Sequence, residues 1–164
     1  MEIERKFLLN DIPDLSGYSS DEIEQGYLSF EPEIRIRKKG SKFFITMKGE
    51  GSLSRTEVEK EIDSTIYEIL INLLQGRKIK KTRYKIGLKD GLVAELDVYH
   101  EKLEGLYTVE TEFSSEKQAS LFELPVWFGK EITDDKRYKN KNLARNDDVK
   151  DLIPSSGYTR LLKK

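Results

Sequence analysis

Apolar and polar residues alternate with a period of two along most of this chain, which is the pattern of half-buried β-strands. Eight segments show the alternation, and they are residues 2–9, 25–30, 33–38, 42–48, 55–63, 79–87, 92–99 and 107–113. Lys39-Gly40-Ser41 and Asp90-Gly91 are typical hairpin connections between such segments. The alternation therefore predicts a mainly β domain (α+β) built from antiparallel strands.

Three stretches change to the helical period. After Ser64, a candidate N-cap, apolar residues recur at helical spacing at Ile66, Ile69, Leu70, Leu73 and Leu74. We expect this stripe to lie in the core and Gly76 to end the helix. A second helix is predicted from Ser114 or Ser115 to about Leu124, and a third over residues 140–145. These helices can cover the apolar faces of the strands.

The polar faces of the strands carry charges that are sorted by sign. Basic residues occupy two of them, at Arg35/Arg37 and Lys81/Arg83/Lys85, and acidic residues occupy three others, at Glu57/Glu59/Glu61, Glu95/Asp97 and Glu110/Glu112. Solvated faces usually mix signs, and like charges two residues apart repel, so a counter-charge is expected from elsewhere. With helices outside, these faces would line a closed barrel of about eight strands, which can hold a small ligand. A polyanion would bind to the basic residues of such a cavity, and divalent cations bound with it would neutralise the acidic ones.

The N-terminal strand adds a candidate cation site. Glu2, Glu4 and Lys6 share one face of the predicted strand. Two carboxylates at this spacing can hold a hard divalent cation through oxygen, and the lysine that follows suits a phosphate carried by that cation.

The composition of the chain argues against several other kinds of site and partner. The 164 residues suit one domain, and the absence of cysteine with a single histidine argues against thiolate or multi-histidine metal centres. A net charge of −1 predicts no general attraction to nucleic acid. No stretch approaches about 18 apolar residues, and charge follows Met1 at once, so we expect a cytoplasmic protein without a membrane partner.

An ordered set of motifs resembles one known family. Glu2-x-Glu4-x-Lys6 resembles the ExExK signature of the CYTH domain, the triphosphate tunnel metalloenzymes. Further similar elements follow in family order: Gln25-Gly26-Tyr27-Leu28, Arg35-x-Arg37, Lys48, Leu53-Ser54-Arg55-x-Glu57-x-Glu59, Lys81-Thr82-Arg83-Tyr84, Glu95-Leu96-Asp97-Val98, Glu110-x-Glu112-Phe113 and Gly129-Lys130-Glu131-x-Thr133. Asp135-x-Arg137-Tyr138-x-Asn140-x-x-Leu143-Ala144 is typical of short bacterial, tripolyphosphatase-like members. The resemblance covers residues 1–145 as a single domain, and residues 146–164 form a C-terminal tail outside it.

The resemblance implies a closed eight-stranded antiparallel β-tunnel that binds triphosphate and Mg²⁺ or Mn²⁺, with two ions present when substrate is bound. Its implied metal ligands are Glu2, Glu4, Asp97, Glu110 and Glu112. Its implied phosphate-binding residues are Lys6, Arg35, Arg37, Lys48, Arg83 and Lys130, with Glu57 and Glu59 as acids that orient basic residues. Tyr27 and Lys81 are both candidates to accept the proton of the attacking water, and the sequence does not choose between them.

The favoured function is metal-dependent hydrolysis of inorganic triphosphate to pyrophosphate and phosphate. A class IV adenylate cyclase or a thiamine triphosphatase would need a pocket for a base or thiazole, and no aromatic set is clearly placed for one. A non-catalytic polyphosphate-binding module would need the cations but not so many carboxylates. The oligomeric state and the choice between the two metals do not follow from the sequence.

Overall fold

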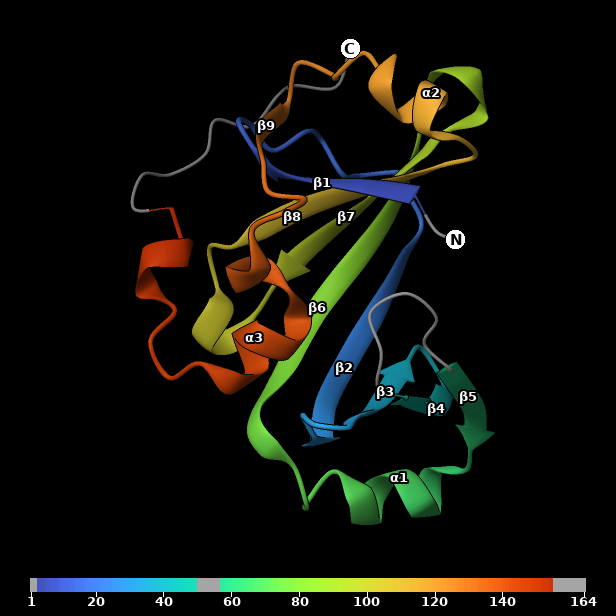
Figure 1. Ribbon diagram of the computed structural model, residues 1–164, viewed down its shortest axis with the longest axis vertical. Helices are drawn as coiled ribbons and strands as arrows, with labels where there is room; N and C mark the ends of the chain where they lie inside the picture. The colour runs from blue at the N-terminus through green and yellow to red at the C-terminus, as the bar shows by residue number, and fades with distance from the viewer. Residues whose placement is uncertain (1–2, 50–56, 155–164) are drawn as a thin grey trace.

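The computed structural model describes residues 3–49 and 57–154, and the strands in these ranges form one curved antiparallel sheet (Figure 1). The strand order is β5-β4-β3-β2-β6-β7-β8-β1-β9. The strands are β1 (Ile3–Leu9), β2 (Ser20–Ser29), β3 (Glu33–Lys39), β4 (Lys42–Lys48), β5 (Glu57–Ile62), β6 (Gln75–Gly87), β7 (Val93–Tyr99), β8 (Tyr107–Phe113) and β9 (Phe128–Glu131).

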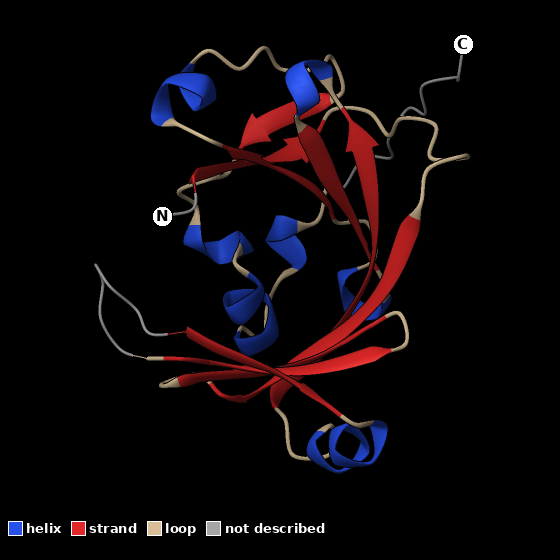
Figure 2. Ribbon diagram, turned by 90° about the vertical axis from the view of Figure 1, so that its right-hand side faces the viewer, coloured by secondary structure: helices blue, strands red, loops and turns tan. Residues whose placement is uncertain are grey.

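The sheet is open, so the predicted closed eight-stranded barrel is not confirmed. It has nine strands, and within the described residues β5 pairs only with β4 while β9 pairs only with β1. The ninth strand, β9, lies where the sequence shows no alternation, because four residues are too few to display a period of two. The sheet bends around a concave side that contains the C-terminal helices (Figure 2).

Two of the predicted helices cover the outer side of the sheet. Helix α1 (Ser64–Leu70) packs on β4, where the rings of Tyr67 and Phe43 lie 4.9 Å apart, and α2 (Glu116–Ser120) packs on β1 and β8. The third, α3 (Asn140–Arg145), has the predicted bounds but packs on β6 and β2 from the concave side. No helix in the described ranges combines the length and the apolar composition that crossing a membrane requires.

Helix α1 differs from its prediction. Its N-cap is Asp63, whose side chain accepts a hydrogen bond from the backbone of Ile66, and the helix ends six residues before Gly76. Ile66 is 45% exposed and Leu73 is 61% exposed, so the expected core stripe is wrong. The helix is too short to bury a whole stripe, and it docks through the ring of Tyr67 instead. The chain then enters β6 at Gln75, earlier than the alternation predicts.

The core has two parts, one on each side of the sheet. The outer part lies under α2 and contains Phe7, Leu9, Ile12, Ile86, Ala94, Leu96, Val109, Trp127 and Phe128. The concave part joins the sheet to the C-terminal segment and contains Tyr27, Ile79, Tyr99, Leu103, Leu106, Ile132, Tyr138, Leu143, Ala144, Val149 and Leu152. The start of the predicted tail is therefore packed, since Val149 and Leu152 are buried.

Candidate functional site

A polar cavity of about 480 Å³ occupies the concave side of the sheet. Its walls come from β1, β2, β3, β4 and β8 and from residues 132–145. Its cationic lining residues are Lys6, Arg35, Lys48, Lys136, Lys139, Lys141 and Arg145, and its carboxylates are Glu4, Glu33, Glu110 and Asp135. The cavity thus offers more positive than negative groups to a ligand.

The strand register places the predicted charges on this side. Tyr27 lies opposite Arg35 in the pairing of β2 with β3, and Lys6 lies opposite Glu110 in the pairing of β1 with β8. Residues that face one another across an antiparallel pair share one face of the sheet. The sorting of charges seen in the sequence is therefore a property of one concave surface.

A buried ion cluster lies beneath the cavity on β6 and β7. Asp97 accepts hydrogen bonds from Arg83, at 2.8 Å from Nε to Oδ1 and 3.0 Å from Nη2 to Oδ2. The Nζ atom of Lys81 lies 2.9 Å from Asp97 Oδ2, and Lys81 is fully buried. Burial opposes ionisation of Asp97, but Lys81 and Arg83 outweigh it and hold the pKa of that carboxyl well below its usual range. Burial likewise lowers the pKa of Lys81 to about 7 although Asp97 favours the cation.

Several buried donors on this face have no aligned acceptor among the described residues. They are Nε2 of Gln25, Nε of Arg35 and Nζ of Lys81, whose contact with Asp97 is an ion pair outside good hydrogen-bond geometry. The other amide atom of Gln25, Oε1, accepts from Arg37 Nε at 3.1 Å. A buried donor without a partner costs about 1–3 kcal/mol. Of these three residues, Arg35 lines the cavity, where a bound anion can offer it an acceptor.

Carboxylates from neighbouring strands also lie opposite one another on this face. Glu4 is the cross-strand partner of Glu112, and Glu95 is the partner of Glu110. Like charges directly opposite destabilise a sheet, and a bound cation relieves that repulsion. Within residues 3–49 and 57–154, no three metal-ligating side chains are gathered closely enough to hold an ion. Glu2 lies outside the described residues, so the proposed metal set stays a prediction.

Asp97 differs from the other predicted metal ligands. Both of its oxygens are engaged by Lys81 and Arg83. Its contacts favour a role in holding these two cations over a role in binding metal.

Of the other predicted site residues, some line the cavity and some do not. Lys48 lines it and pairs with Glu33, with 3.4 Å between Nζ and Oε2. Glu57 and Glu59 lie on the exposed edge strand β5, where Glu57 is opposite Lys48. Lys130 is exposed on β9 and is not part of the cavity lining. The motif residues Leu53, Ser54 and Arg55 fall outside the described part of the chain.

The C-terminal segment forms a wall of the cavity that the alternation of the strands did not predict. It contributes Lys136, Lys139, Lys141 and Arg145 to the lining. Two of the contacts that attach this segment to the sheet come from Lys6, whose Nζ donates to the backbone oxygen of Tyr138 at 3.0 Å, and from Tyr99, whose Oη donates to Asn140 Oδ1 at 2.9 Å. The dense lysines and arginines of residues 136–145 were the available signal.

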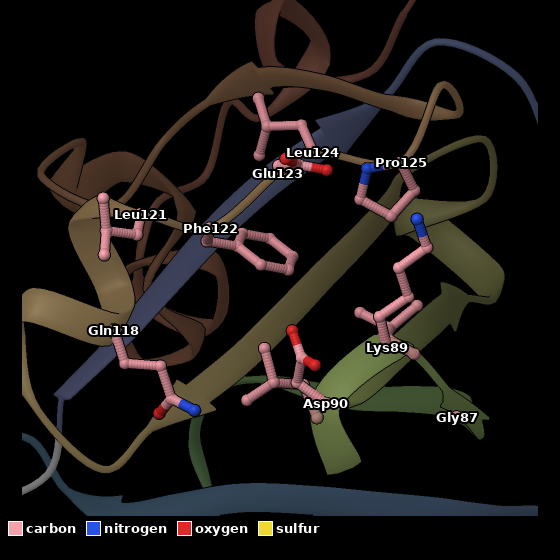
Figure 3. A pocket seen from close by; sticks show the side chains of 11 residues that line it. Gly87, Lys89, Asp90, Gln118, Leu121, Phe122, Glu123, Leu124 and Pro125 are labelled. Carbon is pink, nitrogen blue, oxygen red and sulfur yellow. The ribbon is translucent and has the colours of Figure 1, made fainter.

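A larger cavity of about 920 Å³ lies elsewhere, between the β6–β7 hairpin and residues 118–125 (Figure 3). Its walls include Leu92, Phe122 and Leu124, and Lys89 is the single cation among its described lining residues. None of the predicted site residues lines it. A triphosphate needs several cations, so the smaller polar cavity is the candidate site.

Comparison with known proteins agrees with the resemblance. The model of the CYTH domain matches residues 1–144. An inorganic triphosphatase from Nitrosomonas europaea is 48% identical over 146 residues, which span 87% of this chain and 96% of that protein. An inorganic triphosphatase from Acetivibrio thermocellus is 36% identical over 149 residues, which span 88% of this chain and 94% of that protein.

A solved structure of an inorganic triphosphatase superposes on this fold with a TM-score of 0.76 and 44% sequence identity. The match covers 89% of this chain and 95% of that one. Fold, motif order and sequence therefore agree, and this chain belongs to the CYTH domain family.

Proposed function

We propose that this protein hydrolyses inorganic triphosphate to pyrophosphate and phosphate in the concave cavity. The observation that carries the proposal is the surplus of cations over carboxylates in the lining of that cavity. A linear triphosphate is rich in acceptor oxygens and negative charge, so it matches this surface along its length. The inorganic triphosphatases of Nitrosomonas europaea and Acetivibrio thermocellus, to which the chain is similar, support the same substrate.

The phosphate-binding residues proposed are Lys6, Arg35, Arg37, Lys48 and Arg83. An arginine presents a planar fork of donors that fits phosphate oxygens two at a time, whereas a lysine supplies a compact charge. Phosphoryl transfer depends mainly on positioning and charge neutralisation, so these groups provide much of the required chemistry. Lys130 is left out of this set because it is exposed on the edge strand β9, whereas Arg37 shares the face of Arg35 on β3 and Arg83 is held by Asp97.

Mg²⁺ or Mn²⁺ is the proposed cofactor, held by Glu4, Glu110 and Glu112 together with Glu2. The fit rests on the donor chemistry, because these are all-oxygen ligands and two of them are cross-strand partners of like charge. When bound, a divalent ion neutralises phosphate charge and lowers the pKa of an attacking water. Asp97 is proposed to hold Lys81 and Arg83 instead.

Tyr27 is the residue proposed to contact the attacking water. A proton acceptor must first be within reach of the reacting group. Tyr27 lines the cavity, whereas Lys81 is fully buried beneath it and pairs with Asp97. Burial raises the pKa of Tyr27 to about 12, so the phenol is neutral at pH 7 and orients its partner as a hydrogen-bonding group. Lys81, despite its lowered pKa, then acts by fixing Asp97 and Arg83.

Substrate choice is the direct test of this function. We expect the specificity constant for inorganic triphosphate to exceed those for ATP and thiamine triphosphate by at least ~10-fold, since each tenfold step needs only about 1.4 kcal/mol. Phosphate release would be measured for the three compounds with Mg²⁺ and with Mn²⁺. Formation of cyclic AMP as the dominant reaction with ATP would support the cyclase alternative instead.

Ligand binding should also stabilise the fold, because the ligand binds only the assembled face. At ~100 times its dissociation constant, a methylene-bridged triphosphate analogue that resists hydrolysis should add roughly 2.7 kcal/mol in the presence of Mg²⁺. That corresponds to a melting shift of roughly 5–10 °C for a domain of this size. The measurement is a thermal melt with and without the analogue.

Two variants locate the face that binds. Arg37→Ala should lose much of the shift, because Arg37 shares the concave face with Gln25 and Arg35. Lys60→Ala removes the same charge from an exposed position opposite Ile45 and should keep the shift. The reverse result, with the shift lost in Lys60→Ala alone, would show that the ligand binds the other side of the sheet.

A further inference from the structure

Arg77, near the start of β6, binds the end of a helix that forms part of the cavity wall. Its Nη1 donates to the backbone oxygens of Leu143 and Asn146, the latter at 2.6 Å, and its Nη2 donates to that of Asp147 at 3.1 Å. Carbonyls at the C-terminal end of a helix lack partners within the helix, and a cationic side chain that donates to them stabilises that end. Arg77 therefore caps α3 from a different element, and it does not line the cavity itself.

The residue before it shows how closely β6 and α3 approach. Gly76 has a φ of +70°, in the region that favours glycine, and an added Cβ would collide with the backbone oxygen of Ala144. Two consecutive residues of β6 thus fix the same end of α3, one through the absence of a side chain and the other through a guanidinium group.

Helix α3 carries several side chains of the cavity wall. Asn140, Lys141, Asn142 and Arg145 all line the cavity. Lys141 Nζ lies 2.7 Å from Glu31 Oε1, and the guanidinium of Arg145 lies 5.5 Å from the centre of the Phe30 ring. The start of the helix is attached to the sheet through Asn140, so Arg77 holds the opposite end.

We propose that Arg77 is a positioning residue for triphosphate binding, acting through Lys141 and Arg145. This inference rests on the proposed function of the cavity. Without Arg77 the C-terminal end of α3 loses its cap, and these two cations are no longer held at the cavity wall. The groups proposed for chemistry, Glu4 and Tyr27, lie on β1 and β2 rather than on α3. Binding should therefore weaken while the chemical step is largely preserved.

The test is the steady-state kinetics of Arg77→Ala with inorganic triphosphate and Mg²⁺. KM should rise at least ~10-fold while kcat changes by less than ~3-fold, the pattern of a lost binding contribution. The KM of Arg77→Lys should lie between the wild-type value and that of Arg77→Ala, because a lysine restores the charge without the fork of donors. This conservative variant keeps the test valid if Arg77→Ala folds poorly.

Arg5→Ala is the matched control. Arg5 also makes three hydrogen bonds, two to Glu131 and one to the backbone oxygen of Ala119, and none of these three residues lines the cavity. Its loss should lower the melting temperature without raising KM. An equal rise of KM in both variants would mean that general destabilisation explains the effect, and the inference would be overturned.

A double-variant background tests the proposed route. When Lys141 and Arg145 are both replaced by alanine, Arg77→Ala should raise KM by less than ~2-fold further, because variants that act through the same groups are not additive. An undiminished increase in that background would show that Arg77 acts by another route.

An unchanged KM in Arg77→Ala, with an active wild-type enzyme, overturns this inference alone. A wild-type protein that releases no phosphate from triphosphate overturns the proposed function and this inference with it.

Discussion

Replacement of Glu4 by glutamine is expected to lower the turnover of inorganic triphosphate at least ~100-fold, within the range seen when a group that stabilises a transition state is removed. The change is nearly isosteric but removes one negative charge from a position opposite Glu112. All-oxygen coordination of a divalent ion depends on that charge. Activity would be measured across a titration of Mg²⁺ and of Mn²⁺, together with a melt to show that the fold persists.

The control for this variant is Glu68→Gln, which removes the same charge from an exposed position on α1, outside the cavity. Its activity should match the wild type. Turnover near the wild-type value in Glu4→Gln would remove Glu4 from the proposed metal site, whatever the result for the control.

Replacement of Asp97 by asparagine should lower the free energy of unfolding by about 3–5 kcal/mol, the cost of leaving a buried charge without its partner. Lys81 has no exposed surface, and its ion pair with Asp97 spans 2.9 Å. For a domain of this size, the loss corresponds to a melting temperature lower by roughly 6–20 °C. Chemical denaturation in the presence of a metal chelator would measure this change in the free energy of unfolding.

This measurement separates the two roles considered for Asp97. As a metal ligand, Asp97 would contribute little to the stability of the metal-free protein, and Asp97→Asn would mainly weaken the response to Mg²⁺. As the partner of Lys81 and Arg83, it stabilises the protein without any metal. The half-exposed pair of Asp21 and Lys39, 4.0 Å apart, provides the comparison, since Asp21→Asn should cost less than about 1 kcal/mol.

The face of the sheet on which each charge lies could be predicted because it is a local property. Alternation along one strand decides that Glu4 and Lys6 point one way while Phe7 points the other, and no distant contact is needed. The same reasoning placed Arg35 and Arg37 together on β3. Tyr27 and Lys48 could be added only because the ordered motifs resemble a family.

Features that depend on distant segments could not be predicted. Whether the barrel closes is decided by the meeting of two edge strands, and no short pattern reports on that. The C-terminal wall is held by pairs such as Arg77 with Leu143 and Tyr99 with Asn140, which are far apart in the sequence. Helix α1 shows the same limit, because helical spacing identified an apolar stripe but not that Tyr67 would be its buried residue.

Within residues 3–49 and 57–154, β5 forms an open edge of the sheet, which affects association between molecules. An unpaired strand edge offers backbone donors and acceptors to any other extended chain, and natural proteins protect such edges with charged side chains. Glu57, Glu59, Lys60 and Glu61 are all exposed along this short strand. Two copies meeting edge to edge would bring these carboxylates together, and the repulsion disfavours growth of the sheet into aggregates. The molecule can therefore leave its sheet open without making that edge a template for fibres.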